Sequence, residues 1–451
     1  MTASRQPWER SRPVPTFCGQ AELSDPVLPT TALTRVDGQP YEQARLLVRL
    51  HGEPLGYLNL PLRDGLLDHD AFYETATSAF ADRVAVHLRG DGLPAVRAIG
   101  PEAIPPRERV AHCSRSVVDP TSVTVVVCTR DRAAMLPACL AGLRALDHPD
   151  LEILIVDNAP SDESTREAFD REVGDEPRFR YVREDRPGLS CARNRGVAEA
   201  CGEVIAFTDD DVRVDGGWVA GLLRGLRAGA NVGCVTGLVS TATLENLAEY
   251  YFDSRVTWAS SCQPHLYDMD RHRLAHPLYP YSAGVFGAGA NFAVRAAAIR
   301  ALGGFDEALG AGTATEGGED LDAFVRVLLG GYQLAYEPSA LVWHSHRSDL
   351  DALRRQMWGY GTGLTAYLVK HLGDRRSRGE ILAKLPVGMW KIWKIGDVTR
   401  ESYGREHTMP RGLLARERVG MIAGPVLYAQ SRAAARRGAA ASPLGAVDAR
   451  S

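Results

Sequence analysis

Three consecutive aspartates, Asp209-Asp210-Asp211, follow the apolar run Val204–Thr208. Adjacent carboxylates repel one another, so such a cluster persists where solvent or a cation neutralises it. Mg²⁺ and Mn²⁺ prefer oxygen ligands, commonly one or two carboxylates together with substrate phosphate oxygens. If strand geometry continues, Asp209 and Asp211 point the same way and Asp210 points the opposite way. The pattern predicts a metal site that uses Asp211 assisted by Asp209, with a solvated acidic turn before a helix near Gly217 as the alternative.

Two further polar side chains end strand-like apolar runs. Asp157 follows Leu151–Val156, where its carboxylate can accept a hydrogen bond from a nucleobase; the alternative is a plain turn residue at a strand end. His344 follows Leu341–Trp343, and a neutral imidazole there can complete a metal site. The alternative for His344 is an exposed histidine that binds nothing.

The helix expected over Ser190–Ala200 carries two arginines near its start, Arg193 and Arg195. Ser190 is a candidate N-cap, and the N-terminus of a helix attracts anions. Arginine recognises phosphate through paired hydrogen bonds. The pattern therefore indicates a phosphate-binding helix, with a capped surface helix and solvated arginines as the alternative.

Two glycine-rich segments complete the set of candidates. Gly287–Asn291 (GAGAN) allows a ligand to approach the backbone closely, or it is a tight turn before a helix expected at Arg295–Leu302. Gly317–Asp322 (GGEDLD) opens the helical stretch Phe324–Leu329 and can present one carboxylate as a general base. The alternative is electrostatic, because Asp and Glu are also favoured in the first turn of a helix.

These residues need a scaffold, and the chain from residue 123 onward alternates strand-like and helical patterns. Such alternation predicts an α/β domain whose mostly parallel sheet is covered by helices on both faces. Ligands of such sheets bind beyond the carboxyl ends of the strands. No G-x-G-x-x-G follows the first strand and no Lys follows a Gly, which disfavours a dinucleotide-binding domain and excludes a Walker A loop. The strands are expected at Val123–Cys128, Leu151–Val156, Phe179–Val182 and Val204–Thr208.

The length of 451 residues predicts more than one domain. The N-terminal part reads as a small α+β module, with a hairpin around residues 51–54, a helix over Asp70–Leu88 and a Pro-rich linker from Gly100 to Pro120. The N-terminal module shows no chemical motif. Two interpretations are open for it: docking or acceptor recognition, or a small accessory domain of another use. The expected parts are an N-terminal module with its linker, a sheet domain and a basic, mainly helical extension, at residues 1–118, 119–347 and 348–451.

Charge and composition exclude several classes of protein. Hydrophobic residues make up 45% and charged residues 24%, which excludes global disorder. The net charge of -4 gives no general attraction to nucleic acid. No apolar segment reads as a membrane span, and the N-terminus lacks the pattern of a signal peptide. The eight cysteines show no C-x-x-C spacing, which argues against a zinc ribbon and fits a reducing cytoplasm.

The C-terminal region is basic. From Asp351 to Ser451, 18 Lys and Arg stand against 8 Asp and Glu, a local charge of +10. Within it, Trp390 and Trp393 alternate with lysines in the segment KLPVGMWKIWKIG. Aromatic residues among cations suit a membrane surface, which predicts peripheral contact with the inner face of a membrane. The alternative is a helical extension that packs its tryptophans against the sheet domain.

Seven segments of this chain resemble, in order, the family 2 glycosyltransferases of GT-A fold. The resemblance spans residues 123 to 346, about half of the chain. It implies inverting transfer of a sugar from a nucleotide-diphosphate sugar to an acceptor hydroxyl, assisted by Mn²⁺ or Mg²⁺. The acceptor would be a carbohydrate, a lipid-linked molecule or a natural product. The segments are VTVVVCTRDR, LEILIVDNAPSD, RPGLSCARNRG, VIAFTDDDV, GAGAN, GGFDE and GGEDLD.

The resemblance also implies a role for each candidate. Asp157 resembles the aspartate that binds the base of the donor, and Asp320 resembles the catalytic base. Asp209 and Asp211 resemble the outer residues of the D-x-D motif, whereas His344 is a candidate ligand of the cation from its place at a strand end. The donor site would be formed by Thr129, Arg130, Asp157, Arg193, Asp209, Asp210 and Glu319, with Gly289 and Asn291 bordering the sugar and the acceptor.

Two departures from the family pattern refine this expectation. Asn158 follows Asp157 where many members carry a second Asp, so the chain resembles the V-D-N branch, which includes rhamnosyl- and galactofuranosyl-type transferases. Arg355–Trp358 is not the Q-x-x-R-W of processive synthases, which favours transfer of a single sugar. Two other classes are weighed beside the enzyme: a GT-A-shaped binding or scaffold protein without turnover, and a nucleotidyltransferase. The second lacks its expected glycine-rich loop after the first strand.

Overall fold

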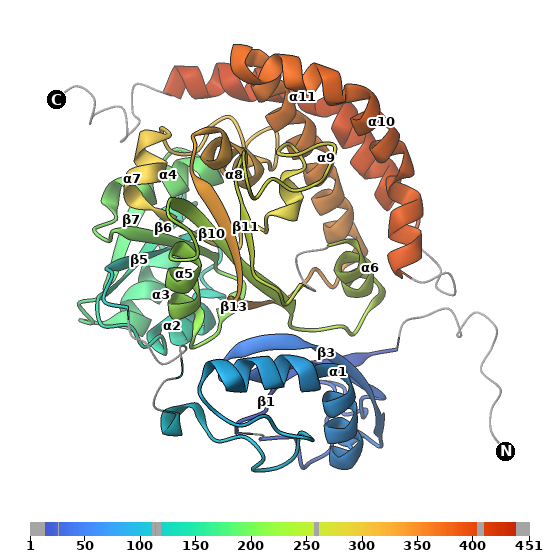
Figure 1. The fold of residues 1–451 in the computed structure, drawn as a ribbon. Coiled ribbons are helices and arrows are strands. Elements are labelled where there is room, and N and C mark those ends of the chain that lie inside the picture. Colours follow the sequence, from blue (N-terminus) through green and yellow to red (C-terminus); the bar gives the residue numbers. More distant parts are fainter. Residues whose placement is uncertain are drawn as a thin grey trace.

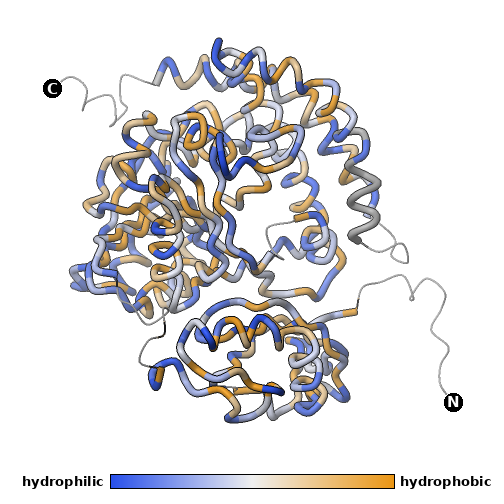
Figure 2. Tube along the Cα trace, in the orientation of Figure 1, coloured by the Kyte–Doolittle hydropathy of each residue, from blue (hydrophilic) through white to orange (hydrophobic). Residues whose placement is uncertain are grey.

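The computed structural model describes residues 14–25, 27–110, 113, 119–256, 261–403 and 410–438, without the side chains of 392, 393, 395–403 and 438. Figure 1 shows a small N-terminal sheet with its helix at the bottom of the view, a larger sheet with helices above it, and long C-terminal helices along the upper right. Hydrophilic and hydrophobic residues alternate along the outer helices, as expected for elements with one covered face (Figure 2).

The N-terminal sheet has the strand order β1-β2-β3-β4. Strands β2 and β3 are antiparallel and joined at His51 and Gly52, which confirms the predicted hairpin. Strand β1 lies parallel to β2, a pairing that sequence analysis did not predict. Helix α1 covers one face and buries Phe72, Phe80 and Leu88 in a core of its own. The elements are β1 Thr16–Glu22, β2 Gln43–Leu50, β3 Glu53–Arg63, β4 Leu66–Leu67, α1 His69–Gly90 and the 3₁₀ helix η2 Arg107–Arg109.

The larger sheet has nine strands in the order β11-β13-β10-β12-β8-β5-β6-β7, with β9 paired to β13. Strands β8, β5, β6 and β7 are parallel, as predicted. Strand β12 runs antiparallel between β8 and β10, so the sheet is mixed. The strands are β5 Val123–Thr129, β6 Leu151–Asn158, β7 Phe179–Glu184, β8 Val204–Asp209, β9 Val212–Val214, β10 Val232–Thr241, β11 His265–Tyr267, β12 Asn291–Arg295 and β13 Gln333–His344.

Helices cover both faces of this sheet, and two hydrophobic clusters fill the space beneath them. The β-branched and aliphatic side chains of the central strands are buried on both faces, which is why these strands read as continuous apolar runs. The helices are α2 Leu136–Arg144, α3 Ser164–Val173, α4 Leu189–Glu199, α5 Trp218–Leu226, α6 Leu247–Arg255, η4 Ala283–Val285, α7 Ala296–Ala301 and α8 Glu319–Leu329.

The C-terminal region is helical, with α9 Leu350–Gly373, α10 Arg375–Tyr403 and α11 Leu413–Gly438. Helix α9 approaches the start of α8 at glycines: a Cβ on Gly363 would lie 2.6 Å from the carbonyl carbon of Gly317. Helix α10 exposes apolar side chains, including Trp390 at 57% exposure, whereas the side chain of Trp393 lies outside the described residues. Among the described residues, no helix is long and apolar enough to cross a membrane. Membrane-surface contact therefore stays a prediction.

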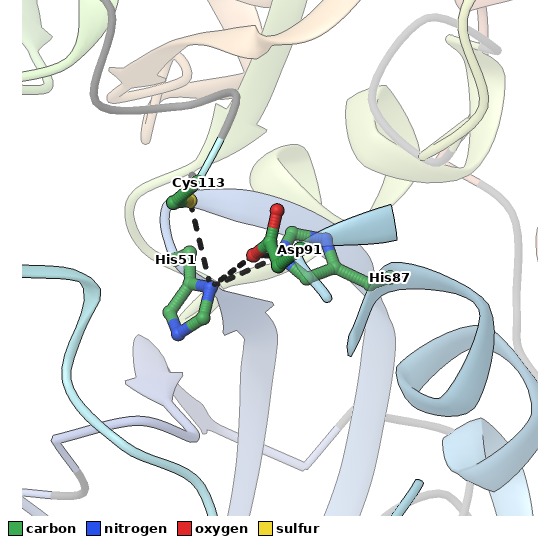
Figure 3. Close-up of side chains that lie close together, drawn as sticks. All are labelled: His51, His87, Asp91 and Cys113. Atoms are coloured by element: carbon green, nitrogen blue, oxygen red, sulfur yellow. Dashed lines mark hydrogen bonds and ion pairs between the residues drawn. The ribbon is translucent and has the colours of Figure 1, made fainter. Parts of the chain in front are cut away.

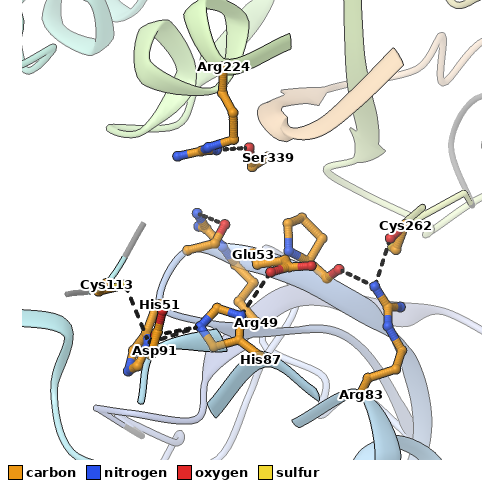
Figure 4. Close-up of polar contacts among 12 residues, drawn as sticks. Arg49, His51, Glu53, Arg83, His87, Asp91, Cys113, Arg224, Cys262 and Ser339 are labelled. Carbon is orange, nitrogen blue, oxygen red and sulfur yellow. Dashed lines mark hydrogen bonds and ion pairs between the residues drawn. The ribbon is translucent and has the colours of Figure 1, made fainter. Parts of the chain in front are cut away.

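The two sheets are joined by ion pairs and hydrogen bonds. Arg49 binds both oxygens of Asp215, at 2.7 and 3.1 Å, in a largely buried pair. Arg45 pairs with Asp253 at 2.7 Å. Figure 4 shows a further link, in which Arg83 of α1 reaches the carbonyl oxygen of Cys262 at 2.9 Å. These contacts hold the N-terminal sheet against β9, α6 and the segment before β11.

Candidate active site

The aspartate cluster lies in the tight turn between β8 and β9. Asp210 is buried and accepts a 2.6 Å hydrogen bond from Thr129 Oγ1, and it also pairs with Arg132. Asp211 accepts from the same guanidinium at 3.0 Å. The prediction that Asp210 points away from Asp211 is wrong, because the chain turns after Asp209 and both carboxylates share Arg132. Arg132 was not among the predicted site residues, since a single arginine in the loop after a strand carries no signal of its own.

His344 ends β13 and faces Asp211, with 3.6 Å between His344 Nε2 and Asp211 Oδ1. The proton positions follow from a chain of hydrogen bonds. Thr241 Oγ1 donates to Asp253 at 2.5 Å, so it must accept from His346 Nε2 at 3.0 Å. In a neutral ring, Nδ1 of His346 then accepts, and it receives the Nδ1 proton of His344 at 3.1 Å.

The remaining nitrogen of His344, Nε2, therefore carries a lone pair. Burial lowers the pKa of His344 and lowers that of His346 to about 3, so both rings are neutral at pH 7. A lone pair and a carboxylate oxygen thus face each other across 3.6 Å. A divalent cation suits such a pair, because it satisfies two electron-pair donors at once. The residues present fit the metal that the sequence predicts.

Asp209, which is half-buried, and Glu319, which is buried, are two further acids near this turn. Burial raises the pKa of Asp209 to about 7, against the opposing effect of Arg193, and the charges of Asp211 and Asp210 raise it further. Burial, and next the charge of Asp320, raise the pKa of Glu319 to about 7. Both groups therefore hold protons in the folded chain at a pH where an unfolded chain has lost them.

This difference predicts a pH-dependent stability in the metal-free protein. Because the folded state binds more protons between about pH 4 and pH 7, the contribution of Asp209 is fully present below pH 4 and is lost as pH rises through 7. Urea unfolding of the wild type and of Asp209→Asn, both in chelator, should show the wild type losing on the order of 1 kcal/mol relative to the variant between pH 5 and pH 7.5. Parallel curves would contradict the raised pKa.

Arg193 of α4 organises the other wall of the site. It is buried, pairs with Glu319 at 2.9 Å and donates to the carbonyl oxygen of Gly289 at 3.0 Å. Its guanidinium also lies over the rings of Phe207, Phe292 and Phe305, at 5.9, 5.4 and 5.6 Å from their centroids. The prediction of a phosphate-binding helix is not supported by this arrangement, because the guanidinium is already engaged by protein groups.

Asp320 is held by the backbone of the GAGAN segment. Gly289 N donates to Asp320 Oδ2 at 2.9 Å, and Leu321 N donates to Oδ1 at 2.8 Å. A Cβ on Gly289 would lie 2.8 Å from Asp320 Oδ2, so only glycine permits this approach. Each carboxylate oxygen keeps a further lone pair for a ligand.

These groups converge on one cavity of about 970 Å³, within the size range of small-molecule sites. It lies beyond the ends of β8, β10 and β13, and α9 and α11 close its other side. The predicted site residues that line it are Arg193, Asp209, Gly289, Glu319, Asp320 and His344. Thr129, Arg130, Asp157, Asp210, Asp211 and Asn291 are not among its lining residues.

Asp157 is fully buried at the end of β6. Its Oδ2 accepts from Tyr181 at 2.7 Å, while Oδ1 is buried and has no hydrogen-bond partner among the described residues. Burial raises the pKa of Asp157. A buried acceptor without a partner calls for an explanation, and an incoming donor group is one. Nearby, Thr129 is committed to Asp210, and Arg130 is exposed beside Asp131.

Two assignments made from the sequence change in the structure. Asn291 uses its whole amide for the sheet: it accepts from Trp218 Nε1 at 2.8 Å and donates to the carbonyls of Leu238 and Ala340. Its side chain therefore links β12 to β10 and β13 by hydrogen bonds beneath the site. Ser190 is not an N-cap, because α4 begins after Gly188 and the hydroxyl of Ser190 donates to the carbonyl of Leu309.

Asn158 also has a structural explanation. Its amide donates to the carbonyl of Arg186 at 2.7 Å and its carbonyl oxygen accepts from Gly188 N at 2.9 Å. Asparagine can make both bonds because it carries a donor and an acceptor, whereas an ionised aspartate only accepts. The departure from the double aspartate thus positions the PGLS loop that leads into α4.

The mixed α/β sheet places clustered acids beyond its strand ends, where the ligands of such sheets bind. Residues 124–284 match the family model described as Glycosyl transferase family 2. Over these residues the chain is therefore similar to the family 2 glycosyltransferases, and it has a GT-A-like α/β fold with a helical C-terminal region.

Similar proteins cover part of the chain. The pre-mycofactocin glycosyltransferase of Mycobacterium tuberculosis is 30% identical over 256 residues, which span 55% of this chain and 48% of that protein. Polypeptide N-acetylgalactosaminyltransferase 6 of Mus musculus is 26% identical over 275 residues, or 57% of this chain and 42% of that protein. The chain thus spans about half the length of the curated relatives it matches.

Among solved structures, the mannosyltransferase PcManGT from Pyrobaculum calidifontis in complex with GDP-Man and Mn²⁺ is 20% identical to this chain. The alignment covers 74% of this chain and 80% of that one, with a TM-score of 0.43. At this TM-score, the fold assignment rests on the family match and on the strand order described above.

Proposed function

We propose that this protein is a glycosyltransferase that moves a single sugar, with inversion, from a nucleotide-diphosphate sugar to an acceptor hydroxyl. The observation that carries the proposal is the convergence of Asp209, His344 and Asp320 on one cavity in a chain whose residues 124–284 match the family 2 model. Asp320 would take the proton of the acceptor hydroxyl as that oxygen attacks the anomeric carbon. Its two backbone hydrogen bonds hold the carboxylate in place beside the cavity.

We further propose that Asp211 and His344, assisted by Asp209, hold a divalent cation, Mn²⁺ or Mg²⁺. Such a cation stabilises negative charge on a departing diphosphate. The lone pair of His344 Nε2 facing Asp211 supports this assignment. Arg132 and Arg347 also lie near Asp211, at 3.0 and 3.8 Å, and can neutralise phosphate charge beside the cation.

Donor and acceptor are assigned to different parts of the chain. The unpartnered Oδ1 of Asp157 supports its role as acceptor for the donor base, with Thr129 and Arg130 nearby. The V-D-N segment supports a transferase of rhamnosyl or galactofuranosyl type. The acceptor side would be formed by the start of α9, where Arg355, Gln356 and Tyr360 line the cavity. A carbohydrate, a lipid-linked molecule or a natural product would bind there.

The proposed division of the chain remains 1–118, 119–347 and 348–451. The proposed location of the protein is the cytoplasm, where α10 would contact the inner face of the membrane. The exposed Leu382, Met389 and Trp390 support that contact.

Thermal unfolding with nucleotides tests the proposal. UDP, dTDP and GDP are each titrated with and without Mn²⁺; the accepted nucleotide at about 100 times its Kd should stabilise the chain by about 2.7 kcal/mol. Asp211→Asn should lose the part of the shift that depends on Mn²⁺, because it removes the charge facing His344. Asp175→Asn, at an exposed turn after α3, is the matched control and should keep it.

Two results would separate the alternatives. Stabilisation by a nucleotide without release of sugar from any donor would favour the binding or scaffold protein over the enzyme. No shift with any of the three nucleotides, in the presence of Mn²⁺, would contradict the donor site itself.

A further inference from the structure

Four side chains converge in the N-terminal module, and none of them lines the cavity described above (Figure 3). His51 lies in the turn between β2 and β3, His87 and Asp91 lie at the end of α1, and Cys113 lies in the linker that follows. Each offers one ligand atom, and these four atoms all lie within 4.8 Å of one another. Nothing in the region that matches family 2 requires such a cluster, since it lies outside residues 124–284.

The distances suit a tetrahedral metal. His51 Nδ1 lies 3.0 Å from His87 Nε2, 3.1 Å from Asp91 Oδ2 and 3.7 Å from Cys113 Sγ. His87 Nε2 lies 3.2 Å from Asp91 Oδ2. Zinc–ligand bond lengths and tetrahedral angles require about 3.3 Å between two nitrogen or oxygen ligands and about 3.6 Å between sulfur and nitrogen. These four distances differ from the tetrahedral values by at most a few tenths of an ångström, and every other pair of ligand atoms lies within 4.8 Å.

The hydrogen bonds on the far side of each ring orient it for metal binding. His51 Nε2 lies 3.0 Å from the carbonyl oxygen of Pro105, which can only accept, so Nε2 carries the proton. His87 Nδ1 lies 2.9 Å from Glu53 Oε2 and carries the proton of its ring (Figure 4). In neutral rings, the nitrogens that face the cluster therefore hold lone pairs. Metal-bound histidines are oriented by this kind of carbonyl or carboxylate partner.

Burial makes the convergence costly without a cation. The side chains of His51, Asp91 and His87 are exposed by 0, 4 and 6%, and Cys113 is buried. Two lone pairs, a carboxylate and a sulfur atom then face one another away from water. We propose that His51, His87, Asp91 and Cys113 form a structural zinc site. Four protein ligands that include sulfur and imidazole suit zinc, and a closed set leaves no position for a substrate.

The site would fasten the linker to the module. Its ligands come from a hairpin turn, a helix end and a segment that lies shortly before β5 at Val123. A metal bond to Cys113 would therefore fix the point where the chain leaves the N-terminal module for the region that matches family 2. It would act together with the Arg49–Asp215 pair, which joins the same hairpin to the loop after β9.

The first measurement is the metal content of the full-length chain, purified without added metal and analysed by mass spectrometry. We expect about one zinc per chain in the wild type, and the same content in Asp211→Asn, which separates this site from the proposed catalytic cation. Cys113→Ser should lower the zinc content at least about tenfold, because the thiolate is lost. Cys262→Ser, at another buried cysteine outside the cluster, is the matched control and should keep the metal.

Cobalt exchange supplies a readout that identifies the sulfur ligand. The wild type and Cys262→Ser, reloaded with Co²⁺, should show a thiolate-to-cobalt charge-transfer band, and Cys113→Ser should lack it. A second variant, His87→Ala, should also lose zinc, with folding checked by circular dichroism. A folded wild-type chain without zinc, and without the cobalt band after loading, would overturn the proposal. Zinc retained in both ligand variants would overturn it as well.

Discussion

Replacing Asp320 by asparagine should lower the rate of sugar transfer by about 10²–10⁴-fold, the range that a general base contributes. Asparagine can keep the hydrogen bond from Gly289 N through its single oxygen but loses the one from Leu321 N, because its amide nitrogen only donates, so circular dichroism must show that the variant is folded. It cannot take a proton from an acceptor hydroxyl. The fall should appear in kcat, while the nucleotide-induced thermal shift is unchanged. The measurement is steady-state release of nucleotide from the accepted donor.

Glu316→Gln is the matched control for this experiment. Glu316 lines the same cavity a few residues before Asp320, and the substitution removes the same charge. If Asp320 is the base, Glu316→Gln should retain most of the activity, and only Asp320→Asn should lose it. Equal losses in the two variants would point to a general effect of cavity charge and would count against Asp320 as the base.

Replacing Arg193 by methionine should destabilise the protein by about 3–5 kcal/mol, the cost of leaving one partner of a buried ion pair uncompensated. Glu319 would lose its 2.9 Å partner, and the carbonyl of Gly289 would lose its donor. Urea unfolding at pH 7.5 measures the effect. At that pH the orphaned carboxylate costs most, because the pKa of Glu319 is already raised to about 7.

The same helix offers a matched control. Arg195 pairs with Glu199 at 2.9 Å but is about one third exposed, so Arg195→Met should cost at most about 0.5 kcal/mol. The double variant Arg193→Met with Glu319→Gln should recover part of the loss, because the buried charge goes with its partner. A cost for Arg193→Met no larger than that for Arg195→Met would contradict the buried pair.

The central strands were predictable because their signal is local. Val123–Cys128 and Leu151–Val156 are continuous apolar runs, and the structure places β5 and β6 there within two residues at each end. Strand β12 was not predictable in this way. Its five residues, NFAVR, follow a glycine-rich segment and read as part of a turn, and only pairing with β8 and β10 makes them a strand.

The residues of the candidate site also differ in whether the sequence could predict them, depending on whether their roles rest on local signals or on contacts with distant residues. The rule that ligands bind beyond the strand ends brought Asp209 and His344 together correctly, since it depends only on the order of strands. The role of Asn291 depends on Trp218 and Ala340, which are distant in sequence. The GAGAN segment alone therefore could not predict that the Asn291 amide holds neighbouring strands together. The zinc cluster combines one turn, one helix end and one linker. Its only local sign is His87 and Asp91, four residues apart on one face of α1.

Because of the glycine contact between α8 and α9, the candidate active site cannot be transferred to another protein by exchanging only the residues that match the family model. The match ends at residue 284, yet Asp320 and His344 lie beyond it. Behind Asp320, the Gly317-Gly318 bend rests on the backbone of Gly363, where any side chain would force the two apart. A chimera that exchanged only residues 124–284 would import new residues at Asp157 and Asp209 and keep Asp320, the proposed general base. A chimera that exchanged α9 would move that base without altering a single motif of the sheet.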